Sequence, residues 1–135
     1  MLINAGKVYA GLNVLRNTVD QNKDNAALRM AYATFLMDNA ESYKSAQREL
    51  EKVVALEPNN SLAYKKLGII AQKREDFLLS KNWFEKAASL DENDADTFYR
   101  LGVLVSTKFN DLQDQAVEYF KKAIKKNYNL SLIHI

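Results

Sequence analysis

The sequence predicts an all-α protein in which helical hairpins stack into an α-solenoid. Its 135 residues contain four glycines and one proline, fewer than the turns of a sheet protein of this size require. Asparagine recurs every 34 residues within polar clusters, at Asn25, Asn59 and Asn93. Between the clusters, apolar residues follow one another at intervals of three and four, which is the spacing of one helix face. Equal blocks of helical spacing indicate a helical repeat protein.

The composition excludes several functional classes. Hydrophobic residues make up 47% of the chain and charged residues 27%, the balance of a folded globular protein. Cysteine is absent and the only histidine is His134, which excludes thiolate chemistry, zinc clusters and histidine triads. A net charge of +2 predicts no nucleic-acid partner, and the lack of an apolar run of roughly 18 residues predicts no membrane span. We therefore expect no cofactor and no metal site.

The first helix is expected at residues 4–20. We interpret residues 1–26 as the second helix of a preceding repeat whose first helix is absent from the sequence. Residues 27–60 form the first full block, with helices expected at 27–39 and 43–56. Each block is expected to fold as two antiparallel helices joined by a tight turn.

The second block, residues 61–94, predicts helices at 61–74 and 77–90. Asn60 and Asp76 directly precede these helices. Both are residue types that cap helix N-termini, because their side-chain oxygens accept hydrogen bonds from free backbone N–H groups. The helix starts are therefore well defined in this block.

The third block, residues 95–129, predicts helices at 95–108 and 113–127. It keeps the register of the other blocks only with a two-residue insertion between Lys108 and Gln115. The insertion does not change the expected fold.

Residues of matching size occupy matching positions in the three blocks. Positions 4, 7, 8, 20, 24 and 27 hold, in block order, Met30, Tyr64 and Phe98; Ala33, Leu67 and Leu101; Thr34, Gly68 and Gly102; Ala46, Ser80 and Ala116; Leu50, Phe84 and Phe120; Val53, Ala87 and Ala123. The large residues predict a shared core, since one helix pair cannot bury its apolar face alone. Gly68 and Gly102 predict a close approach of two helices, at a helix-propensity cost of about 1 kcal/mol each.

This pattern resembles the tetratricopeptide repeat (TPR), a 34-residue unit that prefers aromatic, Leu-Gly, small, aromatic, Ala and Pro at these positions. The resemblance covers residues 27–129 as three repeats. The first repeat carries the turn proline as Pro58, whereas Glu92 and Tyr128 stand where proline is usual in the others. The resemblance implies a right-handed superhelix of stacked repeats that binds other proteins.

The last six residues, 130–135, break the pattern because they are apolar and uncapped. A repeat array needs a polar, solvated helix at its end. The six residues also match a translation of the transposon end of tagmentation sequencing adapters. We interpret them as a non-native tail, which makes His134 foreign to the natural protein and the chain a fragment. The alternative interpretation is a frayed natural C-terminus.

The sequence contains no motif for catalysis. A Ser-x-x-Lys motif, a Gly-rich phosphate loop and histidine-based motifs are all missing. Asp91, Glu92 and Asp94 lie in a turn, where carboxylates solvate the chain or cap a helix. We therefore expect that the chain is not an enzyme.

Four lysines form a stripe on the last helix, at Lys121, Lys122, Lys125 and Lys126. The stripe would suit an acidic partner or a nucleic-acid backbone. A solvated helix face near a C-terminus is the simpler interpretation, because cations also suit that end of the helix dipole.

The resemblance implies a concave groove that holds extended or helical peptides and is lined by five positions of each repeat's first helix. Carried over by register, the groove residues are Leu28, Ala31, Phe35, Asp38, Leu62, Lys65, Ile69, Gln72, Lys73, Tyr99, Val103 and Ser106. The floor is largely apolar, and exposed apolar stripes mark interaction sites. The alternative is that a further helix of the parent protein covers the stripe.

We expect Lys65, Lys73 and Arg100 to favour an acidic flank on the partner. Of the clamp residues that some TPR proteins use to hold a chaperone's C-terminal carboxylate, only Arg100 is matched, which disfavours that function.

We therefore expect a protein–protein interaction scaffold that binds a peptide or helix segment of a partner in this groove. One alternative is the substrate-recruiting arm of a larger enzyme, such as a glycosyltransferase or a kinase. Another is a module that self-assembles through its uncapped ends. Frequent lysine and asparagine suggest an AT-rich, bacterial source. The expected location is the cytoplasm, or the periplasm if an export signal precedes the fragment.

Overall fold

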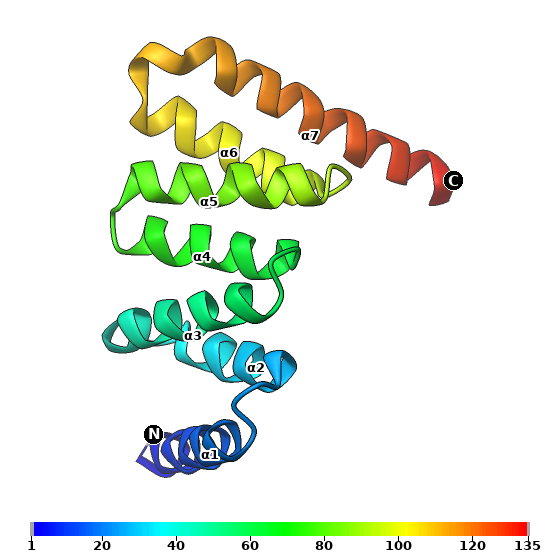
Figure 1. Cartoon of the computed structure of the whole chain (residues 1–135). Coiled ribbons are helices and arrows are strands. Elements are labelled where there is room, and N and C mark those ends of the chain that lie inside the picture. Colours follow the sequence, from blue (N-terminus) through cyan, green and yellow to red (C-terminus); the bar gives the residue numbers. More distant parts are fainter. Residues whose placement is uncertain (1, 135) are drawn as a thin grey trace. The chain divides into compact units, whose positions relative to one another are not determined.

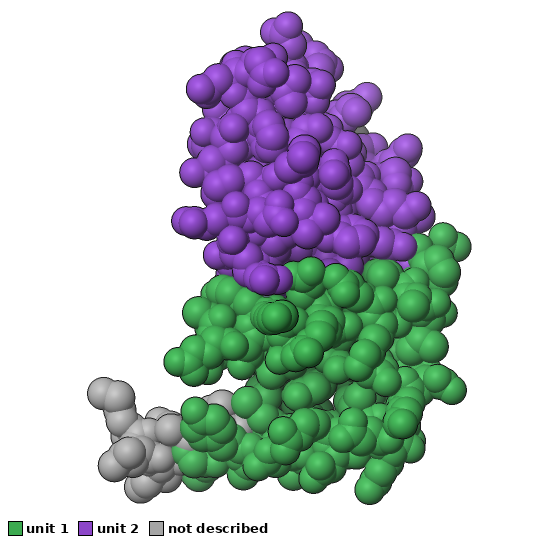
Figure 2. All heavy atoms as spheres, turned by 60° about the vertical axis from the view of Figure 1, so that its left-hand side comes forward, with its two compact units in different colours: residues 1–59 green, residues 60–135 purple. Residues whose placement is uncertain are grey.

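The computed structural model describes the backbone of residues 2–134 and the side chains of residues 6, 7 and 9–127. It divides into two compact units, residues 1–59 and 60–135, which Figure 2 shows in different colours. Residues 2–134 form seven α helices and two short 3-10 helices, with no strand in that range (Figure 1). The predicted all-α class is confirmed.

Unit 1 contains α1 (Leu2–Gln21), α2 (Ala26–Leu36), the 3-10 helix η1 (Ala40–Ser42) and α3 (Tyr43–Leu56). Helix α2 packs against both α1 and α3. The core of the unit consists of buried aliphatic side chains from all three α helices, namely Val19, Ala33, Leu36, Ala46, Leu50 and Val53. None of these six is more than 6% exposed.

Helix α2 ends earlier than its apolar spacing predicts, at Leu36 rather than at residue 39. Asn39 is the reason, because its side chain accepts a hydrogen bond from the backbone N–H of Glu41 (3.0 Å) and so starts η1. An asparagine that bonds to the backbone two residues on competes with the helix for that backbone. Helix α2 starts directly after the polar cluster that contains Asn25, whose side chain caps the helix by accepting a hydrogen bond from the N–H of Leu28 (3.1 Å).

Unit 2 contains α4 (Ser61–Lys73), α5 (Phe77–Leu90), α6 (Ala95–Lys108), the 3-10 helix η2 (Asn110–Leu112) and α7 (Gln113–His134). Helices α4 and α5 form one antiparallel pair, α6 and α7 a second, and α5 packs against α6. One cluster of core residues joins the two pairs, namely Phe84, Ala88, Phe98, Leu101, Leu104 and Ala123. Each pair thus buries its apolar face on the next, which is the stacking of a solenoid.

The turn between α4 and α5 combines two capping devices. Glu75 has a left-handed φ of 63°, and the N–H groups of Glu75 and Asp76 donate to the carbonyls of Gln72 (3.0 Å) and Ala71 (2.9 Å). These two bonds end α4 in a Schellman motif. The side chain of Asp76 then accepts from the N–H of Leu79 (3.3 Å) and starts α5. The predicted cap at Asp76 is confirmed, as is that at Asn60, which accepts from Ala63 N–H (3.1 Å).

The two helical glycines lie where two helices meet, as predicted. A methyl group at Gly68 would lie 2.6 Å from the ring of Phe84, and one at Gly102 would lie 2.7 Å from the ring of Phe120. Real side chains do not approach so closely, so only glycine admits these rings. The hydroxyl of Ser80 also donates to the carbonyl of Gly68 (2.7 Å) and ties α5 to α4.

The two extra residues of the third block are shared between a helix and a turn. Helix α6 has 14 residues where α4 has 13. The link between α6 and α7 spans 109–112, whereas the link between α4 and α5 spans 74–76. The 3-10 helix η2 lies in this longer link.

Fifteen of the eighteen matched residues are buried. Met30 and Phe120 are half-buried and Thr34 is exposed. The division of the chain into a half repeat and three full repeats stays a prediction, as does the right-handed superhelix. The proposed non-native tail, 130–135, lies outside the residues whose side chains are described.

Candidate functional site

All twelve residues predicted to line a groove lie at the surface, exposed or half-buried. Leu28, Ala31, Phe35 and Asp38 belong to unit 1, and the other eight belong to unit 2.

The unit 1 residues do not all lie on one helix. Leu28, Ala31 and Phe35 are on α2, and 46% of the surface of Phe35 is exposed. Asp38 lies in the turn beyond the last residue of α2, because that helix ends at Leu36. The expectation that Asp38 continues the helical row is therefore wrong.

In unit 2, apolar side chains lie exposed on α4 and α6. Leu62 is 51% exposed and Tyr99 is 56% exposed, while Ile69 and Val103 are half-buried. We call these four residues the α4–α6 face. Ile69 packs against the core cluster from one side, and the ring of Tyr99 lies 6.1 Å from that of Phe120. Ile69 and Tyr99 thus contact packed residues, while Leu62 and Tyr99 keep about half of their surface exposed.

An ion-pair network joins α4 to the start of α6 beside this face. The Lys65 ammonium lies 3.0 Å from Asp94 Oδ2 and 2.9 Å from Asp96 Oδ2. Asp96 also accepts a hydrogen bond from Arg100 Nε (2.8 Å). Two of the three cations that were expected to favour an acidic partner are thus already paired inside the chain.

The network shifts the pKa of each charged partner towards the charged form. Partial burial opposes ionisation, but the hydrogen bonds to Asp96 and Asp94 outweigh it and raise the pKa of Lys65. Burial likewise opposes ionisation of both aspartates, and the hydrogen bonds from Lys65 prevail and lower their pKa values. Asp94 has a second role, because it caps α6 by accepting from the N–H of Thr97 (3.3 Å).

We expect the contribution of this network to stability to disappear in acid. A carboxylate whose pKa is lowered by folding stabilises the fold above its unfolded pKa, near 4, and this contribution is lost as the pH falls through the lower folded value. The variant Lys65→Met should therefore be less stable than the wild type at pH 7, and the difference should shrink as the pH falls below the unfolded pKa of the aspartates. Urea unfolding of both proteins across this range measures the difference. A difference that stays constant with pH would contradict the network.

Within the described residues, no group of three or more His, Asp or Glu side chains is placed to hold a metal ion. In the same part of the chain, no helix is both long and apolar enough to cross a bilayer. The α4–α6 face offers apolar contact area beside paired charges. Such a surface can bind another molecule, and it presents no nucleophile paired with a base.

Sequence reasoning missed the partners of Lys65. Register assigns the lysine to the groove and the polar cluster assigns Asp94 to a turn, and neither pattern indicates that Lys65 pairs with Asp94 or Asp96. One signal was available, because Lys65 has Tyr99 as its counterpart in the next block and Asp96 lies three residues before it. Residues at neighbouring positions of adjacent first helices are within reach of a lysine side chain.

No protein-family model and no curated protein sequence matches the chain. Solved structures do. A double mutant of MamA RS-1 is similar with a TM-score of 0.83 and 24% identity over 96% of this chain and 71% of its own. MamA from Desulfovibrio magneticus RS-1, residue 41 to its end, has a TM-score of 0.81 and 24% identity, over 95% and 71% of the two chains. YrrB, described as a TPR protein with an unusual peptide-binding site, has a TM-score of 0.72 and 24% identity, over 85% and 58%.

Proposed function

Because the chain has the fold of TPR proteins, we propose that it is a protein–protein interaction scaffold that binds a peptide or helical segment of a partner. The observation that carries the proposal is the exposure of Leu62 and Tyr99 on the α4–α6 face. Burying apolar surface contributes about 25 cal/mol per Å². Side chains of this size, held open to water beside a packed core, stabilise a complex when a partner covers them.

The distance between the apolar residues of the face matches the spacing of side chains on a helical or extended peptide. Leu62 and Ile69 are seven residues apart on α4, or about 10 Å along the helix axis. A partner helix with apolar residues at i, i+3, i+4 and i+7 presents anchors over the same length. An extended segment of about three residues also spans this distance. The peptide-binding site named for YrrB is consistent with such a ligand.

The paired charges beside the face alter the expected partner. With Lys65 and Arg100 held by Asp94 and Asp96, an acidic flank on the partner would have to displace existing ion pairs. We therefore propose that apolar anchors, rather than acidic residues, decide binding at this face. The recruiting arm of a larger enzyme, self-assembly and a cytoplasmic location stay predictions.

The test uses peptides selected from a displayed random library on the immobilised chain. We expect Leu62→Glu to weaken binding of the selected peptides at least about tenfold, because it places a charge in the apolar contact. Leu62 is a better site for this change than Ile69, which packs against the core. Calorimetric titration gives the affinities, and circular dichroism confirms that the variant is folded.

Leu78→Glu is the matched control. Leu78 is 61% exposed and lies on α5, outside the α4–α6 face. The same change of charge and shape there should leave the affinity within about twofold, as for a surface residue outside the contact. Equal weakening by the two variants, or full binding by Leu62→Glu, would refute the face as the binding site.

A further inference from the structure

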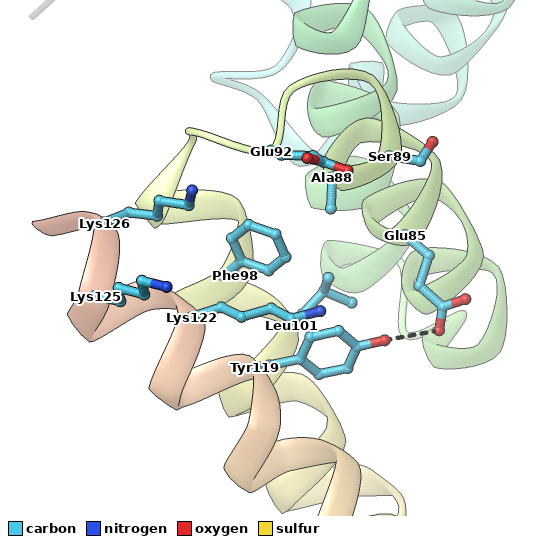
Figure 3. A pocket seen from close by; sticks show the side chains of 10 residues that line it. All are labelled: Glu85, Ala88, Ser89, Glu92, Phe98, Leu101, Tyr119, Lys122, Lys125 and Lys126. Atoms are coloured by element: carbon cyan, nitrogen blue, oxygen red, sulfur yellow. Dashed lines mark hydrogen bonds between the residues drawn. The ribbon is translucent and has the colours of Figure 1, made fainter.

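A concave site lies within unit 2, on the side formed by α5, α6 and α7. It is a pocket of about 510 Å³ (Figure 3). We call it the α5–α7 pocket. Its volume is in the range of pockets that hold one or two side chains or a small ligand. None of the residues of the α4–α6 face lines it.

The floor of the α5–α7 pocket is apolar and rigid. Phe98, Leu101 and Ala88 line it, and all three belong to the core cluster of the unit. They are only 5%, 0% and 7% exposed, so their positions are fixed by packing. A ligand side chain that enters the pocket would meet preformed apolar surface and would not need to open the core.

Three lysines of α7 form one wall, Lys122, Lys125 and Lys126. Figure 3 shows them extending from α7 towards Phe98. Lys122 Nζ lies 5.5 Å from the centre of the Phe98 ring, and Lys126 Nζ is 3.3 Å from the neutral Asn93 Oδ1. Among the described residues, no carboxylate forms an ion pair with any of these three lysines. Their charges are therefore available to a ligand.

The fourth lysine of the stripe differs from the other three. Lys121 does not line the pocket, its side chain is 70% exposed, and its ammonium lies 3.6 Å from Glu118 of the same helix. From the sequence, the simpler interpretation places all four lysines on one solvated helix face. The structure separates them into three pocket residues and one residue outside the pocket.

The opposite wall carries two carboxylates, Glu85 and Glu92. Glu85 is already paired with Lys81 (2.6 Å) and accepts a hydrogen bond from the Tyr119 hydroxyl (3.3 Å). Burial, followed by the charge of Glu85, raises the pKa of Tyr119 to about 12, so this hydroxyl stays a donor in neutral solution. Glu92 is the second carboxylate of the lining, which also holds three lysines, so the pocket lining carries a net positive charge.

We propose that the α5–α7 pocket binds an acidic peptide segment, which inserts one apolar side chain onto the floor and places carboxylates against Lys122 and Lys125. The apolar floor favours a peptide over a nucleic acid, since a phosphate backbone gains nothing from it. The net charge of the whole chain, only +2, adds no general attraction for polyanions. This site is additional to the α4–α6 face and has the charge preference that the face lacks.

The probe is an acetylated, amidated pentapeptide with one phenylalanine between two pairs of glutamates, added to the isotope-labelled full chain. We expect the methyl resonances of Ala88 and Leu101 to shift in NMR spectra as the peptide binds. Lys125→Glu should weaken binding about fivefold or more in about 0.15 M salt, because a carboxylate then replaces an attracting charge. Two variant peptides test the ligand side. Replacing the glutamates with glutamine, or the phenylalanine with alanine, should also lower the affinity about fivefold or more.

Lys121→Glu is the matched control, since it makes the same change of charge on the same helix outside the pocket. We expect the affinity of this variant for the peptide to stay within about twofold of the wild type, because the changed side chain is exposed and lies outside the pocket lining, where salt screens its charge. Leu62→Glu should also bind this peptide normally, which separates the pocket from the α4–α6 face. Equal weakening by Lys121→Glu, shifts confined to the α4–α6 face, or no shift at millimolar peptide would each overturn the proposal. A short single-stranded DNA is the competitor. If it displaces the peptide and binds more tightly than the peptide does, the proposal is overturned in favour of a nucleic acid.

Discussion

Replacing Phe84 with alanine is expected to lower the free energy of unfolding by about 3–5 kcal/mol. Its ring is 0% exposed and lies in the cluster that joins the two helix pairs of unit 2. Removing it deletes apolar contacts and leaves a cavity above Gly68, which the surrounding helices cannot fill without moving. Urea unfolding followed by circular dichroism measures the loss. A loss below about 1 kcal/mol would show that the ring is not buried at this site.

Phe120 supplies the matched control for Phe84. It occupies the same repeat position and lies over Gly102 as Phe84 lies over Gly68, but it is only half-buried. Because less apolar surface is lost, Phe120→Ala should cost about half as much as Phe84→Ala. The sequence predicts equal losses for the two residues, since it assigns both to the core. Equal measured losses would therefore contradict the structure and favour the simpler repeat pattern.

The contact between Gly68 and Phe84 can be tested by measuring the stability of single and double variants at the two positions. In the wild type, Gly68→Ala should destabilise the fold, because its methyl group would lie 2.6 Å from the ring. In the Phe84→Ala background the ring is gone, and the same change should stabilise the helix by up to about 1 kcal/mol. This reversal of sign in a double-mutant cycle reports direct contact of the two residues.

The repeats made the core predictable because each buried position occurs three times in the sequence. The matched position holds leucine in the first block and phenylalanine in the other two, at Leu50, Phe84 and Phe120, and this common place in three blocks indicates a row of core residues. The turns were predictable to within a residue for a similar reason. Asn59 and Asn93 mark the 34-residue period, but the residues that cap α4 and α6 are their neighbours Asn60 and Asp94.

The pocket on α5, α6 and α7 was harder to predict, because it depends on features that do not repeat. In the second block, Lys86 matches Lys122, but Ser89 and Leu90 stand where the third block has Lys125 and Lys126. Periodicity therefore predicts no shared function for the lysines. Their convergence on one apolar floor depends on how α7 lies against α6, which the sequence pattern does not specify.

The 34-residue period does predict that Arg29 is buried. Its matched positions in the later blocks hold Ala63 and Thr97, which are 0% and 1% exposed. Arg29 is accordingly only 8% exposed, although its charge makes it look like a surface residue. Arg29 forms an ion pair with Glu49 of the first block, and the position that matches Glu49 in the second block holds Trp83. A pair of opposite charges thus replaces a small residue and a large aromatic one.

We expect Glu49→Met to destabilise unit 1 by about 3 kcal/mol. The Arg29 guanidinium donates to Glu49 Oε2 through Nη1 (2.7 Å) and to the Lys23 carbonyl through Nε (2.7 Å), and the side chains of the ion pair are only 10% and 13% exposed. Without Glu49, a nearly buried cation keeps only the carbonyl as a partner. Amide hydrogen exchange in α2 and α3 locates the effect, and urea unfolding gives its size.

The double variant Arg29→Met with Glu49→Met decides what the ion pair contributes. If the charges mainly satisfy each other, removing both should restore at least half of the stability that Glu49→Met loses, since two flexible apolar side chains fill a similar volume. The hydrogen bond from Arg29 to Lys23 is still lost, so recovery should be incomplete by about 1 kcal/mol. A double variant no more stable than Glu49→Met would show that Arg29 holds α2 mainly through the Lys23 carbonyl. A loss below about 1 kcal/mol in Glu49→Met itself would show that water solvates the guanidinium, against the burial that the structure gives it.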